Sequence, residues 1–142
     1  MHIVTPEKIA AVMALTPSPH TFSELDGMVR LGLPKSALRE SIEHVGRTSD
    51  ERKSILHAII AEATFKRRSD RLTPTESERA ERLARVFASA KYVWDSEADG
   101  REFLHAPHPL LENRTPLDVS MTELGARRVE ELLWKLFYGM PA

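Results

Sequence analysis

Residues 73–94 read TPTESERAERLARVFASAKYVW, and this stretch carries the strongest secondary-structure signal in the chain. Thr73 supplies a side-chain cap, Pro74 suits the first helical position, and Glu76 completes a capping box. The apolar residues that follow recur at intervals of three and four, as in a helix with one buried face: Ala80, Leu83, Ala84, Phe87, Ala90 and Trp94. The stretch therefore predicts a helix of about six turns.

Shorter segments on both sides of this helix also show helical spacing, each bounded by a cap or a helix breaker. Gly32 and Gly46 end two of them, and Thr115-Pro116 repeats the cap-and-proline start. Strand-type alternation of apolar and polar residues does not occur. We therefore expect an all-α fold, with helices over 6–15, 22–31, 34–45, 50–59, 63–70, 74–94, 97–105 and 122–138 and a further helix start at 115–118.

The composition is that of a globular protein and excludes several functional classes. The 142 residues are 42% hydrophobic and 29% charged, with a net charge of −1. No apolar run approaches the roughly 20 residues of a membrane span, and the N-terminus lacks a signal-peptide pattern. The absence of Cys excludes disulfides, a thiolate zinc site and a Cys nucleophile. We expect a cytoplasmic protein that contacts no membrane.

The pattern of polar residues supports neither catalysis nor a bound metal. His105 and His108 lie in a proline-rich loop without the Cys or acidic companion that a metal site needs. No glycine-rich phosphate loop occurs. Glu130 and Glu131 point about 100° apart on a helix, which prevents a shared-proton pair. We therefore expect no enzymatic activity, no cofactor and no metal.

The expected last helix has two different faces. At about 100° per residue, one side collects the residues of a core face: Gly125, Val129, Leu132, Leu133 and Leu136, with Phe137 at its edge. Trp134 and Tyr138 fall on the opposite side, one turn apart, together with Arg127 and Glu131. Either another helix of the chain covers this aromatic pair, or the pair binds a partner, because Trp and Tyr are common interface anchors.

The segment 47–71 is basic, with seven cations and four anions. Two short helices joined by a brief turn near 60–62 resemble a helix-turn-helix, whose second helix enters the major groove of DNA. On such a helix, Lys and Arg contact phosphates, and the arginine fork reads guanine edges. The candidate DNA-binding residues are Thr64, Lys66, Arg67, Arg68 and Arg71. A Lys-Arg-Arg sequence is also common at a solvated helix end, so both interpretations stay open.

Four motifs occur in order along the second half of the chain: ESERAERLARVFASA at 76–90, WDSEADGREFLHAPHPLL at 94–111, RTPLDVSMTELGARRVEELL at 114–133 and YGMPA at 138–142. This series closely resembles the C-terminal toxin-binding domain of Xre/MbcA/ParS-type antitoxins, over roughly residues 72–142. Members similar to this chain carry an Xre-like helix-turn-helix upstream. The match is poorer before residue 72, where Ile60-Ala61-Glu62 stands in place of the usual small or glycine-containing turn.

The resemblance implies a two-part architecture. It consists of an N-terminal arm over 1–19, a helix-turn-helix DNA-binding region over 20–72 and a toxin-binding domain over 73–142. In this interpretation the long helix joins the Xre-like bundle to the small helical domain.

The resemblance also implies a function and partners. Such antitoxins are the antidote halves of two-gene modules, and their usual partners are RES-domain toxins, which degrade NAD+. Members form homodimers, bind operator DNA to repress their own operon, and block the toxin's active site with their C-terminal end. The toxin-binding residues implied here are Arg127, Glu131, Trp134, Phe137, Tyr138, Gly139, Met140, Pro141 and Ala142. Two alternatives remain, a stand-alone helix-turn-helix transcriptional regulator and a helical adaptor that does not bind DNA.

Overall fold

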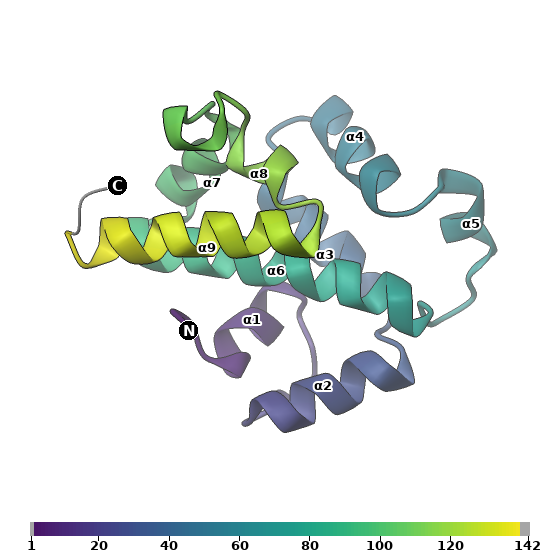
Figure 1. The fold of residues 1–142 in the computed structure, drawn as a ribbon. Helices are drawn as coiled ribbons and strands as arrows, with labels where there is room; N and C mark the ends of the chain where they lie inside the picture. Colours follow the sequence, from purple (N-terminus) through teal and green to yellow (C-terminus); the bar gives the residue numbers. More distant parts are fainter. Residues whose placement is uncertain (1, 140–142) are drawn as a thin grey trace.

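The computed structural model describes residues 2–139, which fold into helices joined by short connections (Figure 1). The helices are α1 (Pro6–Val12), α2 (Phe22–Leu31), α3 (Lys35–Val45), α4 (Ser49–Ile59), α5 (Glu62–Arg67), α6 (Pro74–Trp94), α7 (Glu97–His105), the 3-10 helix η1 (Pro109–Leu111), α8 (Pro116–Val119) and α9 (Glu123–Phe137). No β-strand forms within these described residues, and the prediction of an all-α fold is confirmed.

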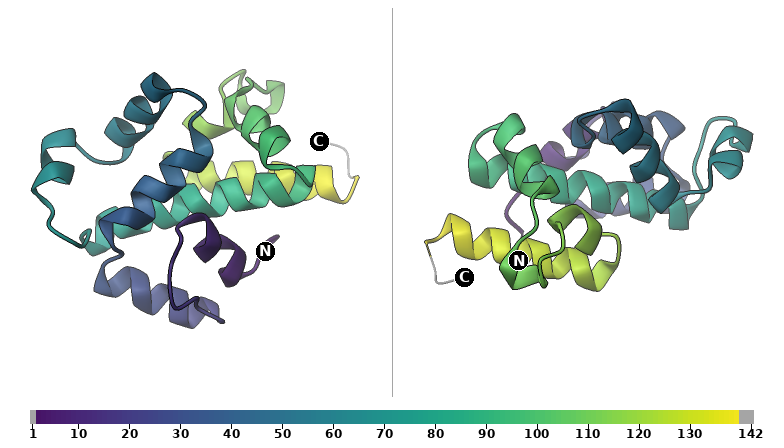
Figure 2. Two further views of the ribbon diagram at one scale, coloured as in Figure 1. Left: turned by 180° about the vertical axis from the view of Figure 1, so that it is seen from behind. Right: turned by 90° about the horizontal axis from the view of Figure 1, so that it is seen from above.

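The long helix α6 runs through the middle of the molecule, and elements from both halves of the chain pack on it (Figures 1 and 2). Its start is the predicted capping box. The Thr73 hydroxyl accepts a hydrogen bond from the Glu76 backbone N–H at 3.2 Å, and the Glu76 carboxylate accepts one from the Thr73 backbone N–H at 2.9 Å. The helix stops at Asp95, which has a left-handed backbone with φ 49°. α9 lies alongside α6 and runs in the same direction.

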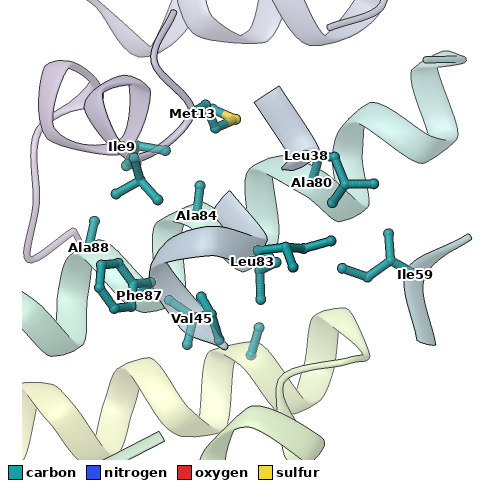
Figure 3. Close-up of a cluster of buried hydrophobic side chains, with 14 of the residues drawn as sticks. Ile9, Met13, Leu38, Val45, Ile59, Ala80, Leu83, Ala84, Phe87 and Ala88 are labelled. Carbon is teal, nitrogen blue, oxygen red and sulfur yellow. The ribbon is translucent and has the colours of Figure 1, made fainter. Parts of the chain in front are cut away.

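One hydrophobic core connects the two halves of the chain through α6 (Figure 3). Ala80, Ala84 and Ala88 are buried at intervals of four residues, and such small side chains let neighbouring helices approach closely. Phe87 is fully buried beside them. The side chains that meet them from other elements are Ile9 and Met13 from α1 and its end, Leu38 and Val45 from α3, and Ile59 from α4. The core therefore fixes the orientation of α6 relative to the helices around it.

Two helix ends and the burial of one side chain differ from the prediction. α1 ends at Val12, not near residue 15, because Met13 leaves the helix and Ala14 adopts a left-handed φ of 52°. α5 ends at Arg67, not residue 70, since the Arg68 backbone is extended and its side chain binds Glu76. Trp94, the last residue of the predicted apolar face of α6, is 44% exposed, because the core ends before the last turn.

Candidate functional site

The C-terminal end of α9 presents three aromatic side chains, Trp134, Phe137 and Tyr138, which we call the α9 aromatic cluster. The Trp134 and Tyr138 rings lie 4.5 Å apart between centroids, and the Phe137 and Tyr138 rings lie 5.0 Å apart and edge to face. Phe137 is 41% exposed and Tyr138 is 56% exposed, while Trp134 is half-buried. Phe137 also contacts Tyr92 of α6, with 5.2 Å between ring centroids, so α6 covers the cluster in part and the rest of its apolar area faces outward.

The opposite face of α9 is buried against α6. Val129 and Leu133 are fully buried, and Leu132 nearly so, as the sequence predicts for the core face. Leu136 was expected on this face but is 36% exposed, because the last turn of α9 extends beyond the residues that bury the earlier turns. The earlier turns of α9 are therefore held against α6, while its last turn is exposed.

An ion-pair group between α6 and α9 adds to this attachment. Arg85 of α6 lies 3.4 Å from Glu81, 3.3 Å from Glu123 and 3.1 Å from Glu130, although its Nε–H completes no hydrogen bond. Burial raises the pKa values of the Glu81 and Glu130 carboxyls above their usual range. Arg82 donates a hydrogen bond to the Met121 carbonyl at 3.0 Å. These contacts fix the first half of α9 along α6.

The remaining predicted toxin-binding residues lie around the α9 aromatic cluster or beyond it. Glu131 is exposed and pairs with Lys135 at 3.5 Å, and Arg127 is exposed one turn before it. Gly139 has a left-handed φ of 65°, which glycine adopts without strain. Met140, Pro141 and Ala142 lie outside the described residues.

α4 and α5 follow one another along the chain at one edge of the molecule (Figure 1). The Thr48 hydroxyl caps α4 by accepting a hydrogen bond from the Glu51 backbone N–H at 3.1 Å. Ile59, Ile60 and Phe65 point inward and are buried, so the turn between the helices is fixed from its apolar side. The outer face of α5 is left exposed.

Lys66 and Arg67 occupy this outer face of α5. Both are exposed, and their partners lie on the same helix, since Lys66 pairs with Glu62 at 3.4 Å and Arg67 donates to the Thr64 hydroxyl at 3.3 Å. Thr64 is half-buried beneath them. An exposed ion pair within one helix is weak, so a phosphate can replace it at small cost.

Arg68 and Arg71 differ from Lys66 and Arg67 in their surroundings. Both join α5 and the loop that follows it to other parts of the chain. Arg68 donates two hydrogen bonds to the Glu76 carboxylate, at 3.0 and 2.8 Å, and these hold the pKa of Glu76 below its usual range. Arg71 donates to the Gly32 carbonyl at 2.7 Å. The structure thus brings Thr64, Lys66 and Arg67 together on α5 and places the other two cations at its attachment.

Comparison with known families connects these two surfaces to known domains. The model of the antitoxin Xre-like helix-turn-helix domain matches residues 24–85. The model of the antitoxin Xre/MbcA/ParS C-terminal toxin-binding domain matches residues 89–139. The chain belongs to the Xre/MbcA/ParS antitoxins. A comparison with curated proteins gave no match.

The two matched ranges meet within α6 of the antitoxin and divide the two candidate surfaces between them. α4 and α5 lie in the helix-turn-helix match, and the α9 aromatic cluster lies in the toxin-binding match. The prediction of a helix-turn-helix part followed by a toxin-binding part is confirmed. This domain pair is that of a type II antitoxin, and both domains are binding domains, which indicates a regulatory role.

The structure adds residues to each surface that sequence reasoning missed. Lys35 and Arg39 of α3 lie over the Phe65 ring of α5, at 4.5 and 5.5 Å from its centroid. Their spacing of four residues on one helix was the available signal. Tyr92 of α6 joins the other surface, with its ring 5.2 Å from that of Phe137. Tyr92 was missed because the sequence predicted this helix mainly from its buried face.

The two histidines expected in one loop are used in structural contacts, and the structure places His105 at the end of α7. A ring nitrogen of His105 lies 2.8 Å from the Val45 carbonyl, and His108 accepts a hydrogen bond from the Leu110 backbone N–H at 3.1 Å. Across residues 2–139, no group of three or more His, Cys, Asp or Glu side chains is arranged to hold a metal ion. In the same part of the chain, none of the helices has the length and apolar character that crossing a membrane requires.

Proposed function

We propose that this antitoxin neutralises a RES-domain, NAD+-degrading toxin by covering the toxin's active site with the α9 aromatic cluster and the tail that follows it. The observation that carries this proposal is the exposure of the cluster at the end of a helix whose other face is buried. Large aromatic side chains with a polar tip are the usual energetic anchors of protein interfaces. The cluster also lies in the range matched by the toxin-binding domain.

The proposed mechanism is steric. α9 is fixed along α6 by its buried face and by the Arg85 ion-pair group, so binding through the cluster requires no ordering of the helix backbone. Arg127 and Glu131 flank the cluster with charges suited to the rim of an interface. The RES identity of the toxin rests on the resemblance of residues 72–142 to antitoxins with such partners.

An inhibition assay tests the proposal with a matched pair of variants. The toxin encoded beside this antitoxin is titrated with wild-type, Trp134→Ala and Leu124→Ala protein, and its consumption of NAD+ is followed. Leu124 is a suitable control because it is 70% exposed on the same helix but lies at the opposite end. Trp134→Ala should raise the half-inhibiting concentration roughly tenfold or more, as for an interface anchor. Equal inhibition by all three proteins would refute the role of the cluster.

The tail is tested separately by deleting residues 139–142. We expect the shortened chain to keep the fold, because Gly139 lies beyond the end of α9 and is exposed. It should lose most of its inhibition of the toxin. Undiminished inhibition would remove the tail from the mechanism while leaving the α9 aromatic cluster in place.

We further propose that a homodimer of the antitoxin represses its own operon through α4 and α5. The support is the exposed outer face of α5, with Lys66 and Arg67 available for phosphates and base edges. Helix-turn-helix dimers place two such helices about one turn of DNA apart, which predicts a two-fold symmetric operator. Lys35 and Arg39 stand beside α5 and are suited to flanking phosphate contacts.

A promoter-binding assay at several salt concentrations tests this part. The full chain should shift a fragment of its own promoter, with an affinity that falls as salt rises. Promoter binding without any effect on the neighbouring gene product would favour a stand-alone transcriptional regulator. Toxin binding without promoter binding would favour a helical adaptor.

A further inference from the structure

An open groove of about 830 Å³ lies where α1 approaches the C-terminal half of α6 and the end of α9. Its lining includes apolar residues from three helices and charged residues beside them. The apolar ones are Ala11 and Val12 from α1, Phe87 and Tyr92 from α6, and Phe137 from α9, and the charged ones are Lys8, Lys91, Asp95 and Glu97. This size lies within the range of about 300–1,000 Å³ that accommodates a ligand or an inserted segment. We call it the α1–α9 groove.

The α1–α9 groove is continuous with the α9 aromatic cluster. Phe137 belongs to both, since its ring lies 5.2 Å from Tyr92 in the groove and 5.0 Å from Tyr138 in the cluster. Tyr138 in turn lies 4.5 Å from Trp134. A protein that binds the cluster would therefore contact Phe137, which also lines the groove.

One wall of the groove comes from outside the matched domains. The helix-turn-helix match begins at residue 24, so α1 precedes both family ranges. α1 is nonetheless firmly placed, because Ile9 and Ala10 are fully buried and the Lys8 ammonium lies 4.2 Å from the centre of the Tyr92 ring. Most of the other groove residues, those between Lys91 and Glu97 together with Phe137, fall within the toxin-binding match, whereas His44 falls within the helix-turn-helix match.

We infer that α1 is part of the toxin-binding surface, and that the α1–α9 groove receives a segment of the toxin carrying large apolar side chains. This inference rests on the proposed neutralising role of the α9 aromatic cluster and extends it to a second contact. The occupant is the toxin because the groove continues the surface that the toxin-binding domain presents. Since α1 lies outside the family ranges, this contact serves to distinguish the cognate toxin from related ones.

Photo-crosslinking tests the inference directly on the full-length chain. A benzoylphenylalanine is placed at Ala11, which is exposed and lines the groove, and in a control protein at Ser54, which is exposed on α4 outside it. Irradiation with the purified product of the adjacent gene should join the Ala11 protein, but not the Ser54 protein, to the toxin. The absence of this adduct would overturn the inference. So would an Ala11 adduct formed between two antitoxin chains, or with the chain's own tail, in its place.

A binding measurement separates this inference from the proposed function. Ala11→Trp fills the groove and should weaken toxin binding roughly tenfold, whereas Ser54→Trp, with the same added bulk, should bind as wild type does. If Trp134→Ala weakens binding but Ala11→Trp does not, the groove is excluded and the cluster retained. If Ala11→Trp weakens binding and Trp134→Ala does not, the groove is supported and the cluster is refuted as the main anchor.

Discussion

Glu76 connects the long helix α6 to α5 through Arg68, and its replacement by Ala tests how α5 is held. Its side chain is 10% exposed and accepts hydrogen bonds from Arg68 Nε and Nη2 and from the Thr73 backbone N–H. In Glu76→Ala, the Thr73 hydroxyl still caps α6, but the reciprocal half of the capping box is lost. Arg68 loses both of its hydrogen bonds to this carboxylate.

The expected loss of stability follows from these contacts. Removing half of the capping box costs about 1 kcal/mol. Removing a bidentate, charge-assisted pair costs about 1–2 kcal/mol, a value reduced from that of a buried pair because the Arg68 side chain is 32% exposed. We therefore expect Glu76→Ala to lower the free energy of unfolding by about 2–3 kcal/mol. Arg68→Ala alone should lower it by about 1–2 kcal/mol, since the capping box remains.

A double-mutant cycle measures both stability and DNA affinity. Urea unfolding of the two single variants and the double variant should give a coupling energy of about 1–2 kcal/mol, because each single change already breaks the pair. Promoter affinity should fall in both single variants and no further in the double variant if Arg68 acts by positioning α5. Additive losses of affinity would mean that Arg68 contacts DNA itself. Additive losses of stability would refute the pairing on which the estimate rests.

Three further changes have expected outcomes. Gly125→Ala should lower the free energy of unfolding by about 2–3 kcal/mol, because its Cβ would lie 1.7 Å from the Val119 carbonyl oxygen. Its control, Gly27→Ala, meets nothing within 4 Å and should stabilise α2 by about 0.5–1 kcal/mol. If the two substitutions had equal effects in thermal unfolding, the close approach of Gly125 to the Val119 carbonyl would be contradicted. Lys66→Ala with Arg67→Ala should reduce the slope of log promoter affinity against log salt concentration by about two and leave toxin inhibition intact. An unchanged slope would exclude this face of α5 from phosphate contact. The Glu51 carboxyl has a pKa lowered from 4.5 to about 2 by hydrogen bonds from Arg47, and hydrogen bonds from His44 lower that of Glu97. Both groups are more acidic folded than unfolded, so the stability they supply is present above about pH 4.5 and is lost at lower pH, for Glu51 as the pH falls toward 2. Glu51→Gln should flatten the decline in the free energy of unfolding between about pH 5 and pH 3, as measured by urea unfolding. An identical decline in the wild type and the variant would mean that other groups cause it.

The elements with strong local signals could be predicted from the sequence. The capping box at Thr73 and the cap-and-proline start at Thr115 placed two helix starts correctly, because these signals act within one turn. The buried face of α9 followed from its apolar spacing through Leu133. Leu136 departed from the pattern, because periodicity identifies a face but not where the opposing helix ends.

The tertiary partners of polar residues could not be predicted. Arg67 and Arg68 are adjacent in the sequence, yet Arg67 is exposed and contacts its own helix at Thr64, whereas Arg68 is bound to Glu76, eight residues later. The α1–α9 groove depends on residues about eighty positions apart along the chain, from Ala11 to Tyr92. Such contacts depend on how the helices pack, which no local pattern contains.

The structure of the antitoxin bound to the product of the adjacent gene would test the central claim most directly. We predict that the Tyr138 side chain, 56% exposed in the free chain, becomes almost fully buried against the toxin's active-site cleft, together with Trp134 and Phe137. A complex in which these three rings remain exposed, with the toxin seated on another surface, would contradict the account.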